Sequence, residues 1–215
     1  MFPQLSSVLG EAEAAAVVVL VEADADRAAF LLHHFLSAGL RGGGGVFVLG
    51  LEQSFGHYHS VGLKLGHNLV KLREAGNLVF HEGLRKVLEG GGVLAGGSGG
   101  QESLRGLYRE VVEAAAGCQV VLVDNLAVLA LLGHSPSAVT AFLHQLRRHL
   151  GRRGARLVVR ATLLPGEGAW ARAVALAQLG AGLVLRVEGL PTGHSRCLGD
   201  SGLRAATRDF EFTPF

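Results

Sequence analysis

Residues 17–35 of the chain read VVVLVEADADRAAFLLHHF, and this stretch decides how the rest of the sequence is interpreted. The apolar run Val17–Val21 is too short for a helix and rich in β-branched side chains, which indicates a strand covered on both faces. The residues after it favour a helix that Asp24 or Asp26 can cap. The apolar side of this helix would be formed by Phe30, Leu31, His34 and Phe35. The stretch therefore predicts a strand, a short turn and a helix.

The turn in this unit is the place where nucleotide-binding α/β proteins carry a glycine-rich loop and a lysine that hold phosphate. Here the turn contains Glu22, Asp24 and Asp26, and it has neither glycine nor lysine. An anionic turn repels a polyphosphate where the helix dipole would otherwise attract it. We interpret the acids as partners of the helix dipole and not as a carboxylate pair for acid–base catalysis. The position fits a phosphate-binding loop, and the residues do not.

The composition indicates a globular protein. The chain has 215 residues, of which 49% are hydrophobic and 18% charged. A chain of this length can bury about 70% of its unfolded surface, so we expect a single domain over residues 1–215. The net charge of +2 gives no overall attraction to nucleic acid, although local basic clusters remain.

The N-terminus and the cysteines indicate the compartment. The N-terminal residues MFPQLSSVLG lack the basic region of a signal peptide, and the apolar stretch Ala14–Val21 is far too short to span a membrane. Cys118 and Cys197 lie far apart beside predicted strands, which favours buried free thiols over a disulfide. We therefore expect a protein of the cytoplasm or the nucleus, without membrane contact.

Strands and helices alternate along most of the chain. Short apolar runs predict strands at residues 17–21, 46–51, 78–80, 119–126, 156–164 and 181–190, with a final edge strand at 203–212. Helices are expected at 65–75 and at 138–150, the second of which begins at Ser135 or Ser137. This alternation predicts an α/β fold with a doubly wound, mostly parallel sheet and antiparallel strands near the C-terminus. The glycine-rich residues 90–100 are expected to form a flexible loop.

Several segments resemble a known family. VVLVDNLAVLAL (residues 120–131) is similar to the strand that RecA-type ATPase folds place beside the magnesium ion of the nucleotide. LVLRVEGLPTGHSRCLGDSG (residues 183–202) is similar to their late strand and hairpin. More specifically, six segments together resemble the Elongator complex protein 6 family: MFPQL, FLLHHFLSAGL, QSFGHYHSVGLKLG, AGNLVFHEGL, VVLVDNLAVLALLG and LRVEGLPTG.

The resemblance implies a non-catalytic, RecA-like subunit of the Elongator complex that lacks a phosphate-binding loop and an active site of its own. It implies a hetero-hexameric ring with subunits four and five, in two copies each, that binds tRNA and supports modification of the wobble uridine (U34). The acetyl-transfer and radical chemistry would belong to another Elongator subunit. Two alternatives remain: an active RecA-type ATPase with a degenerate nucleotide site, and an adaptor that binds protein only.

Asp124, which ends the apolar run Val120–Val123, is the sharpest chemical candidate. It could bind a magnesium-bound water beside a triphosphate, or it could cap the turn at Asn125 as an ordinary strand-end aspartate. Without a phosphate-binding lysine the metal would lack its substrate phosphates. We therefore interpret Asp124 as a vestige of a nucleotide site, in a chain with no catalytic residue, cofactor or metal of its own.

The histidines do not have the spacing of a metal site. His33, His34, His57, His59 and His67 have no cysteine or carboxylate at a zinc-finger interval. The polar and aromatic segment 52–64 is expected to be a loop before a helix. Its aromatic and imidazole side chains suit a subunit contact, for which the candidates are Phe55, His57, Tyr58 and His59.

A basic run closes the predicted helix at 138–150. Its members are Arg147, Arg148, Arg152 and Arg153. Cations at the C-terminal end of a helix offset its dipole and solvate the surface, and we favour this interpretation. The functional alternative is salt-dependent contact with RNA phosphates. By the resemblance, the loops facing the channel of a ring would be residues 133–137 and 162–168. They contain His134 and little basic charge, so the RNA contacts would come mainly from the sibling subunits.

Overall fold

The computed structural model describes residues 5, 9–10, 14–23, 28–89, 99–189, 201–207 and 210–212. The strands are β1 (Val17–Glu22), β2 (Val46–Gly50), β3 (Leu78–Glu82), β4 (Val120–Asp124), β5 (Arg156–Thr162), β6 (Leu183–Gly189), β7 (Ser201–Thr207) and β8 (Phe210–Phe212). The helices are α2 (Ala29–Gly42), α3 (Phe55–Lys64), α4 (Leu69–Glu74), α5 (Gly83–Glu89), α6 (Gly99–Ala114), α7 (Leu126–Leu131), α8 (Pro136–Arg152) and α9 (Gly168–Leu179).

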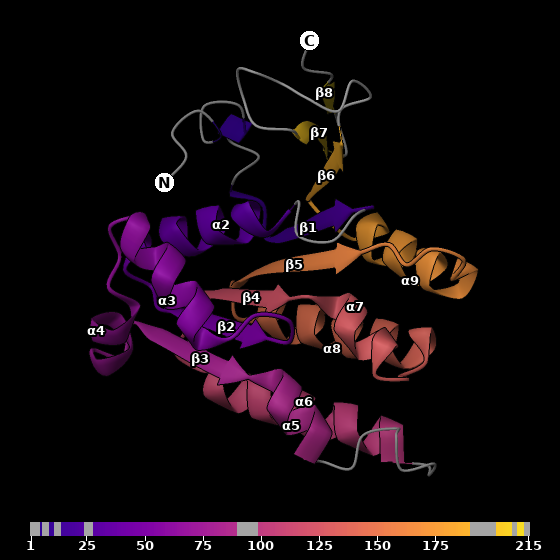
Figure 1. The fold of residues 1–215 in the computed structure, drawn as a ribbon, viewed down its shortest axis with the longest axis horizontal. Coiled ribbons are helices and arrows are strands. Elements are labelled where there is room, and N and C mark those ends of the chain that lie inside the picture. Colours follow the sequence, from indigo (N-terminus) through magenta and orange to yellow (C-terminus); the bar gives the residue numbers. More distant parts are fainter. Residues whose placement is uncertain are drawn as a thin grey trace.

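The described strands form one sheet in the order β3-β2-β4-β5-β1-β6-β7-β8 (Figure 1). Strands β1 to β6 run parallel to one another, whereas β7 pairs antiparallel with β6 and β8 antiparallel with β7. The predicted α/β class, with a mostly parallel sheet and late antiparallel strands, is confirmed. The single edge strand expected at 203–212 is wrong, because the chain reverses there and forms two strands.

Alternation along each strand divides the core between two faces of the sheet. On β5, Leu157 and Val159 face one side and Val158 the other. The first side, which we call the α8 face, is covered by apolar residues of α6, α8 and α9. The second, the α2 face, is covered by α2 together with Tyr58 of α3 and Leu69 of α4. Figure 1 shows these helices on opposite sides of the sheet. Because both faces are covered, the central strands are continuous apolar runs.

Close contact between α2 and the sheet depends on a missing side chain. A Cβ atom at Gly39 would lie 2.9 Å from a methyl group of Val46 and 3.2 Å from one of Val120. Glycine at this position allows α2 to lie directly on β2 and β4.

The cap of α8 agrees with the sequence-based expectation, whereas α3 and α4 differ from it. Ser135 caps α8 by accepting a hydrogen bond from the Ala138 amide at 3.2 Å, as predicted. The expected loop at 52–64 is instead mostly the helix α3, which begins where the Ser54 hydroxyl accepts from the His57 amide at 3.4 Å. The helix expected at 65–75 shrinks to α4, which Asn68 caps.

Two further expectations concern the loop and the membrane. The predicted flexible loop at 90–100 lies outside the described residues except for its last two, which belong to α6. Across the described part of the chain, no helix combines the length and the apolar character that a membrane crossing requires.

Candidate functional site

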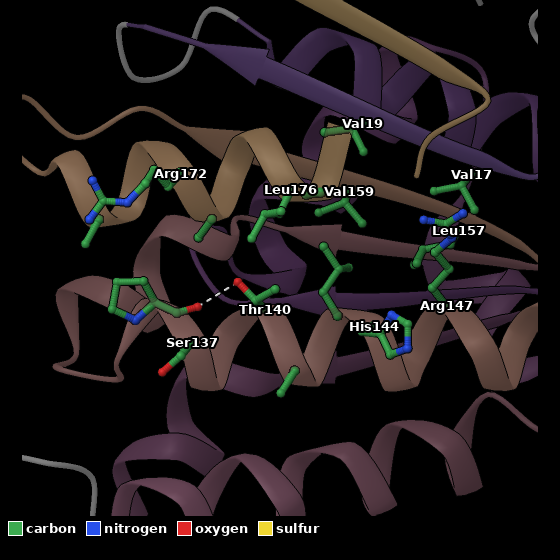
Figure 2. A pocket seen from close by; sticks show the side chains of 16 residues that line it. Val17, Val19, Ser137, Thr140, His144, Arg147, Leu157, Val159, Arg172 and Leu176 are labelled. Atoms are coloured by element: carbon green, nitrogen blue, oxygen red, sulfur yellow. Dashed lines mark hydrogen bonds between the residues drawn. The ribbon is translucent and has the colours of Figure 1, made fainter. Parts of the chain in front are cut away.

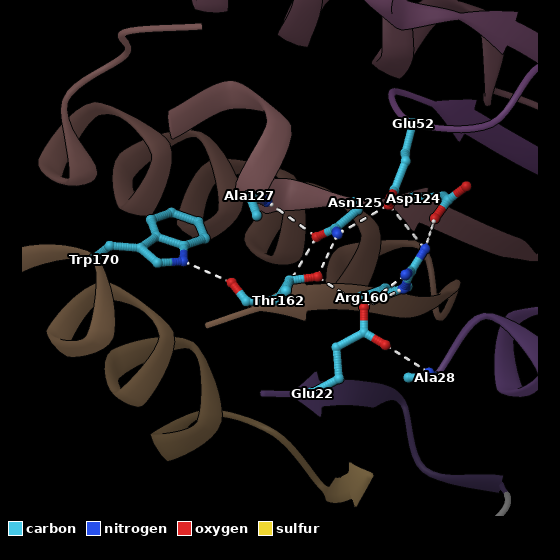
Figure 3. Close-up of polar contacts among 9 residues, drawn as sticks. All are labelled: Glu22, Ala28, Glu52, Asp124, Asn125, Ala127, Arg160, Thr162 and Trp170. Atoms are coloured by element: carbon cyan, nitrogen blue, oxygen red, sulfur yellow. Dashed lines mark hydrogen bonds and ion pairs between the residues drawn. The ribbon is translucent and has the colours of Figure 1, made fainter. Parts of the chain in front are cut away.

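Polar side chains converge where four parallel strands end. Glu22 is the last residue of β1, Asp124 is the last residue of β4, and Glu52 follows β2. Arg160 lies on β5, which pairs with both β1 and β4, so its side chain can reach the ends of both neighbours. In parallel doubly wound sheets, ligands bind outside this carboxyl edge. Figure 3 shows the carboxylates of the three acids around the guanidinium of Arg160.

Arg160 binds all three carboxylates. Its Nε donates to Glu22 Oε1 at 2.7 Å, and its Nη2 lies 2.6 Å from the same oxygen. Its Nη1 donates to Glu52 Oε2 at 2.9 Å and to Asp124 Oδ1 at 3.0 Å. Arg160 has 0% exposed surface, Glu22 and Asp124 have 1% each, and only Glu52 reaches solvent. We call these four residues the Arg160 cluster.

The environment shifts the acid–base equilibria of the cluster. Burial lowers the pKa of the Arg160 guanidinium, but the carboxylates of Glu22, Asp124 and Glu52 raise it more, to a net value above the ordinary one. Burial raises the pKa of the Asp124 carboxyl, and Arg160 offsets only part of that rise. Burial and the nearby Asp124 carboxylate raise the pKa of the Tyr58 hydroxyl. Arg160 is thus a permanent cation within an acidic cluster.

Neutral groups hold the carboxylates in place. The Thr162 hydroxyl donates to Glu22 Oε1 at 2.7 Å. Asn125 Nδ2 donates to the Thr162 hydroxyl at 2.6 Å and to Glu52 Oε2 at 3.0 Å. The indole of Trp170, on α9, donates to the Thr162 carbonyl at 2.8 Å and ties that helix to the end of β5. The cluster is therefore a connected network that joins β1, β4, β5 and α9.

Glu22 also contacts the start of α2. Its Oε2 accepts a hydrogen bond at 2.5 Å from the amide of Ala28, the residue that precedes the helix. A backbone amide at a helix N-terminus is the type of donor that binds phosphate in nucleotide-binding folds. Here an internal carboxylate accepts that hydrogen bond. This agrees with the interpretation of Glu22 as a partner of the helix dipole, while Asp24 and Asp26 lie outside the described residues.

Asp124 has a different structural role from the turn cap considered above. Asn125 is itself the cap of α7, since its side chain accepts from the Ala127 amide at 3.1 Å. The peptide bond between Asp124 and Asn125 is cis. The Asp124 carboxylate pairs with Arg160 across the strands. Its interpretation as a vestige of a nucleotide site stays a prediction.

Sequence reasoning missed Arg160, Glu52 and Thr162. The available signal was an arginine near the end of the otherwise apolar strand LVVRAT (residues 157–162). Alternation places Arg160 on the same face as Val158, where a charge without partners would be costly. An arginine in that position needs carboxylates at the ends of the neighbouring strands.

The four predicted interface residues all belong to α3, and they differ in exposure. Tyr58 is 2% exposed, with its ring 4.8 Å from the ring of His33 and 5.4 Å from that of Phe80. Tyr58 is thus part of the core on the α2 face and cannot form a subunit contact. Phe55 and His59 are half-buried and His57 is exposed, so for these three the subunit contact stays a prediction.

The four predicted RNA-contacting arginines also separate. Arg153 donates from Nη1 to the carbonyl of Ala115 at 3.2 Å and from Nη2 to that of Ala116, just after the end of α6. Arg147 is half-buried between α8 and the end of α9, whereas Arg148 and Arg152 are exposed. Arg153 is exposed as well, but its guanidinium is bonded to these two carbonyls. Contact with RNA stays a prediction for all four.

Neither the described cysteine nor the described metal-ligand side chains form a chemical site. Cys118 is a buried free thiol, and burial raises its pKa, while Cys197 lies outside the described residues. Among the residues whose placement is described, no three His, Cys, Asp or Glu side chains are grouped as a metal ion would require.

The fold is that of the RecA-like class. A KaiC-like protein from the hyperthermophilic archaeon Pyrococcus horikoshii superposes with a TM-score of 0.57 over 90% of this chain and 78% of that one. The two sequences are only 16% identical, so this likeness defines the fold alone.

Sequence comparison then gives the family. The family model for Elongation complex protein 6 matches residues 2–200. Elongator complex protein 6 of zebrafish (Danio rerio) is 36% identical over 220 residues, which cover 91% of this chain and 83% of that protein. The rat and human proteins of the same name are 36% and 35% identical over 68% of this chain and 63% of their own length. The chain belongs to the Elongator complex protein 6 family, and the resemblance stated from its segments is confirmed.

Arg160→Met should lower the free energy of unfolding by about 3–5 kcal/mol, because it leaves buried carboxylates without their counter-charge. The measurement is urea unfolding followed by the fluorescence of Trp170, the single tryptophan. Arg156→Met, on the same strand but outside the cluster, should cost less than about 1 kcal/mol. Adding Glu22→Gln and Asp124→Asn to Arg160→Met should restore part of the loss. Equal losses in the two single variants would contradict the role of the cluster.

His33 should make stability depend on pH. Burial, with smaller effects of His57 and Arg160, lowers the pKa of His33 from 6.5 to about 4. The unfolded chain therefore binds this proton first as the pH falls. The stabilisation is complete above pH 6.5 and is lost between pH 6.5 and 4, with a slope of up to about 1.4 kcal/mol per pH unit. Urea unfolding at several pH values should give a shallower slope for His33→Gln than for the exposed control His144→Gln. An unchanged slope in His33→Gln would show that His33 does not titrate as described.

Proposed function

We propose that this chain is a non-catalytic subunit of the Elongator complex. It contributes a RecA-like domain to a hexameric ring with subunits four and five, and the ring binds tRNA in support of wobble uridine modification. The observation that carries this proposal is the Arg160 cluster, which fills the carboxyl edge of the sheet with an internal cation and its counter-ions. We place the protein in the cytoplasm or the nucleus.

Charge supports a non-catalytic role. In a nucleotide-binding version of this fold, a lysine and a metal ion would offset the phosphates of the ligand. Here Arg160 supplies the positive charge, and Glu22, Glu52 and Asp124 already bind it. A triphosphate would have to approach three carboxylates or separate them from Arg160. Separation leaves buried charges unpaired, which costs several kcal/mol.

The turn after β1 supports the same conclusion. The Ala28 amide already donates to Glu22, so the carboxylate competes with any phosphate for this donor. Asp124 remains at the end of β4, and its Oδ1 accepts a hydrogen bond from Arg160. An active ATPase with a degenerate site would need these contacts to open before substrate could bind.

Exposed apolar side chains support assembly with other subunits. Among the described residues, Leu131 and Leu179 are 70% and 69% exposed, and Leu63 is 52% exposed. Large apolar side chains on a surface are typical of sites that a partner covers. They come from α3, α7 and α9, so more than one surface of this domain would contact neighbours in a ring.

The isolated chain should be poorly soluble and should become a stable hexamer when co-expressed with subunits four and five. Mass measurement by light scattering would test the stoichiometry.

The assembled ring should bind labelled tRNA with an affinity that falls steeply as salt rises, because phosphate contacts release counter-ions. The double variant Arg148→Glu/Arg152→Glu should reduce the salt slope if this subunit contributes contacts, and Arg105→Glu/Arg109→Glu on α6, at the same four-residue spacing, serves as the matched control. A monodisperse monomer that does not associate with subunits four and five would contradict the proposal. Binding of tRNA that does not depend on salt would also contradict it.

The purified subunit should not bind ATP. A titration with fluorescently labelled ATP and Mg²⁺ should show no saturable signal, since the Arg160 cluster excludes phosphate. Saturable binding that is abolished by Asp124→Ala would favour the active ATPase instead. The control Glu82→Ala changes an exposed acid at the end of β3, outside the cluster.

A further inference from the structure

An apolar groove lies between α8 and α9 on the α8 face of the sheet. Its volume is about 790 Å³. Its floor is formed by Val19, Leu157 and Val159, which come from the central strands β1 and β5 (Figure 2). Neither the Arg160 cluster nor the proposed ring requires this groove.

The groove exists because α9 has small residues where it faces α8. Ala169, Ala173 and Ala177 line it at four-residue spacing, which places them on one side of the helix. Side chains of this size leave a depression between the helices, at the base of which Val19, Leu157 and Val159 are themselves buried. Leu176, which also lines the groove, is 55% exposed.

Basic side chains stand at both ends of the groove. Arg172 lies near Ser137 at one end, and Arg147 and His144 lie at the other (Figure 2). No acidic residue is found among the described residues that line it. Ser137 and Arg147 are ten positions apart on α8, so the two basic ends are separated by about 15 Å, or nearly three helical turns.

The walls and floor restrict the type of occupant. Side chains line the groove, and an extended segment laid there would have backbone N–H and C=O groups without partners, which is costly. A helix satisfies its own backbone and can present an apolar stripe to the groove. Its charge must complement two basic ends, which excludes a basic segment and disfavours a neutral one.

We propose that this groove binds an amphipathic helix of a partner protein. The helix has an apolar stripe of about three turns and one carboxylate near each end, roughly ten residues apart. Its apolar side chains contact the exposed Leu176 and the neighbouring alanines of α9, and its two acids pair with Arg172 at one end and Arg147 at the other.

The test uses two synthetic helical peptides and the full chain kept soluble by a fusion partner. Both peptides carry the same leucine stripe; one has glutamates ten residues apart and the other has lysines there. Fluorescence anisotropy should show saturable binding of the glutamate peptide, with the lysine peptide at least about tenfold weaker. Arg147→Glu/Arg172→Glu should reverse this preference. The control Arg148→Glu/Arg152→Glu carries the same charge change on α8 outside the groove, and it should leave the preference unchanged.

Leu176→Asp provides a second variant whose exposed position tolerates substitution. It should abolish binding of the glutamate peptide while the circular dichroism spectrum stays that of the parent chain. Equal affinity for both peptides, absence of binding, or no reversal in the charge-swapped variant would overturn the proposal. A dimer of the chain that Leu176→Asp disperses would also overturn it, because the groove would then bind a second copy. None of these results depends on ring assembly or tRNA binding, so the two proposals fail separately.

Discussion

The ion pairs between Arg160 and the carboxylates of Glu22, Asp124 and Glu52 are the interaction on which this structure depends. They join the ends of β1 and β4 and the segment after β2 to one side chain on β5. Because the guanidinium is fully buried, its charge cannot be satisfied by water. The folded structure of this edge therefore requires the three carboxylates to remain paired with Arg160.

The same interaction explains how a RecA-like fold can exist here without a phosphate loop. A nucleotide-binding site combines an anion at a helix N-terminus with cations beside it. In this chain the anion at the start of α2 is the Glu22 carboxylate, and the cation beside it is Arg160. Both charges belong to the protein, so the edge is stabilised internally. Glu22, Asp124 and Arg160 at this edge of the sheet are part of the core.

The sequence predicts the sheet well because its central strands are buried on both faces. β1 and β4 appear as uninterrupted apolar runs, and the cap at Ser135 follows from local chemistry alone. By contrast, the glycines and histidines of α3 have low helix propensity, so the sequence does not predict this helix. Contacts with α2 and β3 hold Tyr58 in the core, and these partners are distant in sequence.

Two of the four residues of the Arg160 cluster could be predicted from the sequence. Glu22 and Asp124 stand out because each follows an apolar run, whereas Arg160 lies within one and Glu52 lies in a polar segment. Their association requires the strand order, which places β5 between β1 and β4. Adjacency of this kind comes from the crossover connections, and no local pattern specifies it.

The most direct measurement is the exchange of the Arg160 Nε proton with water, followed by nitrogen-15 NMR and assigned through its loss in Arg160→Met. A guanidinium held by buried carboxylates should give a slowly exchanging resonance that does not move when Mg²⁺ and ATP are added. Fast exchange in the free protein, or a saturable shift with ATP and Mg²⁺, would show that the edge is open to a nucleotide and would contradict this account.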